Sequence, residues 1–315
     1  MLCNRFWLGG LFLLVVVSCT LGQEISRPKR AKLPKWETFP SDVFFRDAFQ
    51  EGLIGTRPAK LGGVSPWGSP TRTQKTEASN AAGVAWNRLV APETLEDEVK
   101  SLHLAVQKTV TTPSQFSGGG YQDVRRQFTE LATLFAVISE FDGKVRWKQE
   151  SPLARDLFAR AAANAKVTSI QAFNEAKQRK IDLEELVRGG TLTSSTPTEG
   201  KNNWERICDR APLMERFTAC FDEGIVIWSA NPNSFKQNLN NLKREAELLR
   251  VFAAVLTQAG MEDTGDADYE AYCRQLGKAA EQVLNAVESN DPAAAREAAS
   301  EVGKTCLQCH DGYRA

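Results

Sequence analysis

The chain has 315 residues, 42% of them hydrophobic, which is long enough for two domains of ordinary size, each with its own core. Lysine plus arginine equals aspartate plus glutamate, at 39 each, so the formal net charge is zero. Because no basic field is available to hold phosphates, we expect no nucleic-acid partner.

Residues 1–22 predict an export signal. Arg5 precedes an apolar run from Phe6 to Val17, which is shorter than a membrane span of about 20 residues. Residues 20–22 fit a signal-peptidase site, whereas the residues before Cys19 resemble a bacterial lipobox, which would end the signal at residue 18 and leave Cys19 as a lipid anchor. We therefore expect a periplasmic or exported protein, with a membrane-anchored lipoprotein as the alternative.

Residues 23–80 are rich in Pro, Gly, Ser and Thr and lack sustained periodicity, so they predict an extended leader. From residue 81 the apolar spacing becomes helical and strand-like alternation is almost absent. We expect an all-α fold of tandem helical bundles, the first over residues 81–190. Its stripes are Leu95, Val99, Leu102 and Val106, then Val124, Phe128, Leu131, Phe135 and Ile138, and then a long segment from about Pro152 to Val187.

Residues 191–202 predict a linker, because turn-forming residues dominate and no apolar residue lies between Leu192 and Trp204. Residues 203–315 then hold four amphipathic stretches joined by short loops, a pattern typical of a four-helix bundle. The last stretch begins at Asn290-Asp291-Pro292, where a capping residue precedes proline. The stripes include Met214, Phe217 and Phe221; Leu242, Ala246 and Leu249; Tyr272, Leu276 and Val283; and Ala295, Val302 and Cys306.

The last stretch carries Cys306-Leu-Gln-Cys309-His310, the C-x-x-C-H pattern of c-type haem attachment. Two thiols at this spacing can each add across one vinyl group of the porphyrin, and the next imidazole then points at the iron. All three side chains share one face of a helix. A thioredoxin-like pair lacks its βαβ context, a structural zinc site lacks a second close pair of ligands, and a plain disulfide is the third alternative. The motif predicts one covalent haem c, with His310 as an iron ligand.

The chain has seven cysteines, and export permits disulfides. Once Cys306 and Cys309 are assigned to haem, the other three in the folded part, Cys208, Cys220 and Cys273, leave room for one disulfide at most. Cys220 and Cys273 could bridge the first and third helices of the C-terminal bundle, and Cys208 competes for the same partner. Three unpaired core thiols are the equal alternative.

The C-terminal sequence EVGKTCLQCHDGYR resembles that of the cytochrome c-prime family. In this family the attachment motif lies on the fourth helix of a four-helix bundle and is followed by an aromatic residue and an arginine, here Tyr313 and Arg314. The resemblance extends over about residues 203–315 and implies that Arg314 belongs to the haem site. Residues 81–190 share the helical character but carry no haem motif.

The resemblance also implies two residues on the first helix of the C-terminal bundle. One is an arginine near the haem propionates, and the other, four residues later, is an apolar or methionine side chain over the distal face of the iron. Arg210 and Met214 have this spacing, so Met214 is a candidate iron ligand. Pro212 between them departs from the pattern and leaves Arg206 and Arg216 as alternatives.

What the protein does depends on the sixth coordination position of the iron, once His310 fills the fifth. A Met214 ligand gives an electron carrier, which is the preferred interpretation and requires a redox partner protein in the periplasm. An open face beside Phe217 and Phe221 would bind nitric oxide or carbon monoxide, and a partner-binding scaffold with a structural haem is the third hypothesis. Met261 and His103 are weaker ligand candidates. We expect no catalytic residues, and a homodimer is left open.

Overall fold

The computed structural model describes residues 83–192 and 200–313. The predicted export signal with Cys19, the predicted leader and Arg314 lie outside these ranges, as does most of the predicted linker. Within them every regular element is a helix, which confirms the all-α prediction. None of the helices in the described ranges is both long and apolar enough to cross a bilayer.

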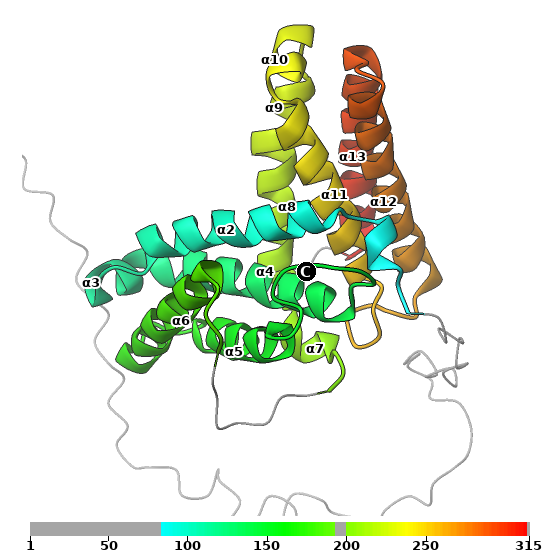
Figure 1. Cartoon of the computed structure of the whole chain (residues 1–315). Coiled ribbons are helices and arrows are strands. Elements are labelled where there is room, and N and C mark those ends of the chain that lie inside the picture. Colours follow the sequence, from blue (N-terminus) through cyan, green and yellow to red (C-terminus); the bar gives the residue numbers. More distant parts are fainter. Residues whose placement is uncertain (1–82, 193–199, 314–315) are drawn as a thin grey trace, which may run out of the picture. The chain divides into compact units, whose positions relative to one another are not determined.

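The N-terminal group of helices is built around α4 (Figure 1). Helix α4 packs against α5 and α2, while α6 packs against α2 and α5. Each of the predicted apolar stripes on α2 and α4 is buried, and the α4 stripe is fully inaccessible to solvent. The helices span Pro92–Thr109 (α2), Tyr121–Glu140 (α4), Ser151–Asn164 (α5) and Ile170–Arg188 (α6), with short turns at Trp86–Arg88 (η1), Pro113–Gln115 (α3) and Phe116–Gly120 (η2).

The stretch from Pro152 to Val187 is two helices, α5 and α6, rather than one long segment. Helix α6 starts anew because the side chain of Ser169 accepts a hydrogen bond from the backbone N–H of Ala172, at 3.1 Å. This is an N-cap, which satisfies a donor that a helix start leaves without a partner. Periodicity alone did not reveal the break, since apolar residues occur on both sides of it.

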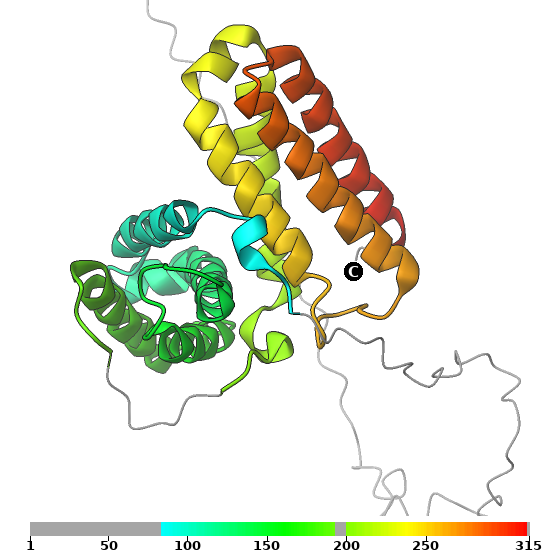
Figure 2. The same ribbon diagram turned by 45° about the vertical axis from the view of Figure 1, so that its right-hand side comes forward.

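The C-terminal group is a four-helix bundle, as predicted (Figures 1 and 2). Its first helix is a continuous run of α8, η3 and α9, in which η3 is a π-helical segment, and α11, α12 and α13 pack in sequence beside it. A π-helical insertion rotates the side chains that follow it relative to an uninterrupted α-helix. The bounds are Trp204–Ile207 (α7), Arg210–Thr218 (α8), Ala219–Ile225 (η3), Val226–Ser229 (α9), Pro232–Gln237 (α10), Leu239–Val255 (α11), Ala267–Glu288 (α12) and Pro292–Tyr313 (α13).

The start of α13 is fixed by Asp291, as the sequence predicted. Its Oδ1 accepts hydrogen bonds from the backbone N–H groups of Ala293 and Ala294, at 2.9 and 3.0 Å. Pro292 occupies the first helical position, where its missing N–H costs no hydrogen bond. Helix α13 therefore begins at a defined residue.

Helix α13 approaches η3 closely at Gly303. A Cβ atom at this position would lie 2.8 Å from Cζ of Phe221, nearer than two carbon atoms pack without repulsion. Gly277 of α12 offers a contrast, because a Cβ atom there would meet its nearest neighbour at an ordinary 3.9 Å. The missing side chain of Gly303 thus leaves room for the Phe221 ring.

We expect Asp291→Ala to destabilise the chain by about 1 kcal/mol, because two N–H groups at the start of α13 lose their acceptor. Asp291→Asn, which keeps a capping oxygen and removes the charge, should lose much less. Urea unfolding followed by circular dichroism measures both. Equal stability of the alanine variant and the wild type would contradict the capping role.

Gly303→Ala should be less stable than Gly277→Ala by about 1 to 3 kcal/mol, because overpacking against Phe221 is added at one position and not at the other. Both substitutions gain the same helix propensity of about 1 kcal/mol, so the difference between the two free energies of unfolding reports the contact with Phe221. Adding Phe221→Leu should recover most of the loss in the Gly303 variant. Chemical unfolding of the wild type, the two glycine variants and the double variant tests this. Equal stability of the two glycine variants would refute it.

Candidate functional site

A cavity of about 550 Å³ lies inside the C-terminal bundle, among α8, η3, α12 and α13. This volume is typical of pockets for small molecules and cofactors. Helix α13 lines it with both cysteines and the histidine of the attachment motif. The first helix lines it with Met214, Phe217 and Phe221.

The three motif residues point the same way because of their spacing. Cys306, Cys309 and His310 are half-buried and all line the cavity. Leu307, between the two cysteines, is 70% exposed, and Gln308 is exposed as well. The sequence predicted this shared face from steps of three and four residues.

Burial in the cavity controls the protonation of the thiols. It raises the pKa of Cys306 to about 11, with a further rise from Cys309 and Asp222. Burial also raises the pKa of Cys309, against the lowering influence of the Arg210 guanidinium. Both thiols therefore carry their protons near neutral pH, and in this state they are weak nucleophiles.

The opposite wall of the cavity comes from the first helix and is mostly apolar. Phe217 is buried, and its ring meets that of Phe252 edge to face at 6.2 Å. Met214 is half-buried, three residues earlier on the same face. Leu256 and Leu276 extend the apolar lining from α11 and α12. The structure thus brings Met214 and Phe217 together with the motif, as the sequence predicted.

The C-terminal end of α13 is tied to the start of α12. The Tyr313 hydroxyl donates a hydrogen bond to Oδ1 of Asp266, at 2.9 Å, and this oxygen also accepts from the backbone N–H groups of Asp268 and Tyr269. The Tyr313 ring packs on that of Tyr269, with centroids 5.2 Å apart. These contacts hold the motif-bearing end of the helix against α12.

Arg210, the residue expected near the propionates, is placed differently. It lines a second cavity, of about 660 Å³, and pairs with Glu262 at 2.6 Å and Asp263 at 2.5 Å. Its guanidinium is still close enough to Cys309 to lower that thiol's pKa. Pro212 does not break α8, because it stands in the first turn. The assignment of Arg210 to the propionates remains a prediction.

None of the other candidates lines the cavity of the motif. Arg206 and Met261 line the second cavity, and Arg216 lies in a buried cluster of ion pairs. His103 of α2 lies beside Gln107, with Nε2 3.2 Å from the amide nitrogen, and does not line the cavity of the motif. Its position agrees with the prediction of a partly buried histidine rather than a ligand.

A third thiol, that of Cys273 on α12, also lines the cavity, a position that was not predicted. The signal was present, since Cys273 stands three residues before Leu276 on the inward stripe. Burial, with a smaller contribution from Cys309, raises its pKa to about 12. Among the described cysteines, Cys208, Cys220 and Cys273 are all free, so the alternative of three core thiols holds in this structure.

These residues fit a covalently held haem. Two thiols and an imidazole enter one cavity from a single helix face, and the facing wall is apolar with one thioether sulfur. Gly303 of α13 has no side chain at the point where the ring of Phe221 approaches the helix. Cys306 and Cys309 would hold the group, and His310 and Met214 are the side chains suited to the iron.

Comparison with known proteins supports part of this assignment. No curated protein and no solved structure gives a significant match to the chain. The family model described as Cytochrome C' matches residues 263–314, a segment that contains α12, α13 and the whole attachment motif. The resemblance predicted over residues 203–315 is confirmed for this shorter segment, which is similar to a family of c-type haem cytochromes.

Proposed function

We propose that this chain is an exported electron carrier whose C-terminal bundle holds one haem c. The observation that carries the proposal is the cavity that Cys306, Cys309, His310 and Met214 line together. When bound, a haem supplies an iron that alternates between two oxidation states and so passes one electron at a time. The role of this chain is to attach the group, ligate it and shield it from water, and no residue is assigned to catalysis.

Attachment uses the thiols of the motif. Each S–H adds across one vinyl group, the sulfur bonding to one carbon and the hydrogen to the other, so that two thioethers form without an oxidant. Cys306 and Cys309 are a turn apart on α13, and both face the cavity. The protonated thiols favoured by burial resist oxidation to a disulfide before attachment.

The axial positions set the function. His310, which follows the second thiol directly, would ligate the iron, and Met214 on the opposite wall of the cavity would be its second protein ligand. A thioether ligand would raise the reduction potential and leave no site for small gases, which suits electron transfer. Its partner would be a redox protein of the same compartment.

Gas binding is the second candidate, and the apolar wall favours it. Phe217, Phe221 and Leu276 line the same cavity as Met214 with apolar side chains. If the Met214 sulfur does not ligate, such a wall suits an uncharged diatomic molecule like nitric oxide or carbon monoxide. The two candidates thus differ in one bond.

We expect the ferrous wild-type protein, matured in cells that attach c-type haem, to show sharp low-spin bands that carbon monoxide does not change. Met214→Leu should become high-spin and bind carbon monoxide, because the sixth position opens. Met261→Leu is the matched control, since Met261 is buried at the other cavity, and it should behave as the wild type. A wild-type spectrum that is high-spin and shifts with carbon monoxide would reject electron transfer in favour of gas binding.

A second prediction concerns attachment. Cys306→Ser and Cys309→Ser should each keep haem through one thioether, whereas the double variant should lose haem to acidified acetone. Cys273→Ser changes the third thiol of the same cavity and should keep its haem through extraction. The assay is the haem absorbance that remains with the denatured polypeptide. Retention by the double variant, or loss from the Cys273 variant, would overturn the assignment of the two thiols.

A further inference from the structure

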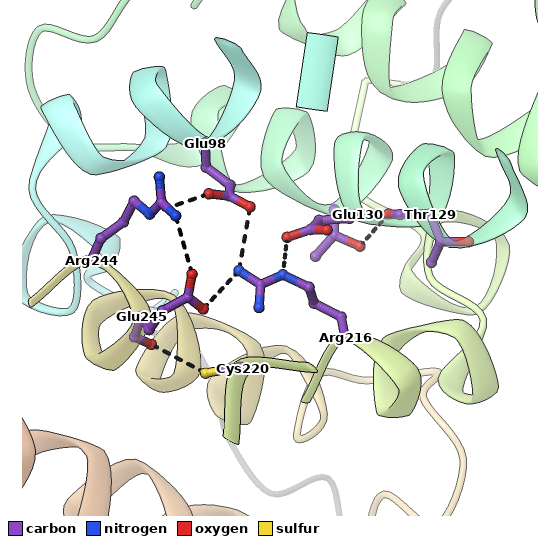
Figure 3. Close-up of polar contacts among 8 residues, drawn as sticks. Glu98, Thr129, Glu130, Arg216, Cys220, Arg244 and Glu245 are labelled. Atoms are coloured by element: carbon purple, nitrogen blue, oxygen red, sulfur yellow. Dashed lines mark hydrogen bonds and ion pairs between the residues drawn. The ribbon is translucent and has the colours of Figure 1, made fainter. Parts of the chain in front are cut away.

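A cluster of buried charges lies where α2 and α4 contact α8 and α11 (Figure 3). Its centre is Arg216, whose guanidinium pairs with three carboxylates. Nε lies 2.6 Å from Oε1 of Glu130, and Nη2 lies 3.3 Å from Oε1 of Glu98 and 2.8 Å from Oε2 of Glu245. The glutamates are 3 to 5% exposed, so water screens these charges little.

A second arginine closes one side of the cluster. Arg244 reaches Oε2 of Glu98 with Nε at 3.6 Å and Oε1 of Glu245 with Nη2 at 3.4 Å. On the other side, the Cys220 thiol of η3 lies 3.8 Å from the backbone oxygen of Glu245. Burial holds the pKa of Cys220 well above its ordinary value, and the thiol is therefore neutral.

The charges of this cluster do not balance. Three carboxylates face two guanidinium groups, which leaves one negative charge in excess if every group is ionised. Oε2 of Glu98 is buried and has no hydrogen-bond partner. The carboxyl groups of Glu98 and Glu130 both contact the guanidinium of Arg216, at 3.3 and 2.6 Å. Two ionised carboxylates held on one buried guanidinium repel each other, which favours a proton on one of them.

We propose that Glu98 and Glu130 form an acid pair that binds one exchangeable proton, which makes the contact between the N-terminal helices and the C-terminal bundle a proton-binding site. The proton neutralises the excess negative charge of the cluster. Release of the proton leaves an unbalanced buried charge at the contact between α2, α4, α8 and α11.

The electrostatics of the surroundings agree with this site. Burial raises the pKa of Glu130 to about 8, in spite of the opposing charge of Arg216 and with a further rise from Glu98. Although burial opposes its charge, Arg216 keeps a pKa well above its ordinary value because of Glu130, Glu245 and Glu98. The facing groups are thus Glu98 on α2, Glu130 on α4, Arg216 on α8, Cys220 on η3, and Arg244 and Glu245 on α11.

The sign of the pH dependence follows from the raised pKa. Between the ordinary value of 4.5 and about 8, the folded chain keeps a proton that the unfolded chain has released. The folded state binds more protons in this window, so the contribution of the pair to stability falls as pH rises through it. Ionisation of the pair near pH 8 ends the decline.

Infrared spectroscopy of the full chain tests the proposal, since the C=O stretch of a neutral carboxyl group is separate from that of a carboxylate. Ordinary glutamates, with a pKa of about 4.3, are ionised at pH 6.5, so a band there reports a perturbed acid. We expect one such band in the wild type, and we expect it to shift in D2O. As the pH rises, the band should disappear with a midpoint near the raised pKa of Glu130, about 8. Absence of the band at pH 6.5 would overturn the proposal.

Two substitutions identify the pair. Glu130→Gln should remove the band, and Glu98→Gln should remove it or move its midpoint lower, because each leaves the other carboxylate to its arginines. Asp123→Asn is the matched control, because Asp123 is an exposed acid on the same helix as Glu130, and it should change nothing. Circular dichroism establishes that each variant is folded. The titration of the wild type tests the proposal even if a variant does not fold. A band that survives Glu130→Gln, or an unchanged midpoint in Glu98→Gln, would refute a shared proton.

Discussion

Cys306, Cys309 and His310 share one face of α13, and the neighbouring helices of the C-terminal bundle leave a cavity in front of that face. A helix that presents two thiols and an imidazole inward needs neighbours that leave space rather than fill it. The bundle provides this space with Gly303 on α13 and an apolar wall on the first helix. The cap at Asp291 fixes where α13 begins, and the buried residues Ala295, Ala299 and Val302 turn the helix toward the core.

The first helix of the bundle has contacts on two sides. Met214 and Phe217 line the cavity, whereas Arg216, between them in sequence, points to the carboxylates of α2, α4 and α11 (Figure 3). Neighbouring residues on a helix point about 100° apart, which lets one short segment serve both environments. The N-terminal helices are thus connected to the wall of the cavity through a buried and polar contact, where a change of one charge is felt strongly.

Much of the fold was predictable because burial leaves a periodic trace. The stripes on α2 and α4 and those of the C-terminal bundle were read from apolar spacing, and they are buried or half-buried in the structure. The face shared by Cys306, Cys309 and His310 followed from helix geometry alone. The break between α5 and α6 was missed, since it depends on the cap at Ser169 rather than on hydrophobicity.

The other features missed depend on contacts between distant segments. The ion pairs of Arg210 with Glu262 and Asp263 were not predicted, because these two acids lie in a loop that periodicity does not position. Cys273 faces the cavity through the packing of α12, and Arg216 brings together Glu98 and Glu130 from two helices whose relative rotation the sequence does not determine.

The most direct test of the account is the mass of the peptide that trypsin releases between Lys304 and Arg314 from the chain matured in cells that attach c-type haem. This peptide, residues 305–314, contains both motif cysteines and no other cysteine. We predict that it carries the added mass of one haem and has no thiol left to alkylate. Recovery of the same peptide with two free thiols, or with a disulfide and no haem, would contradict the central claim.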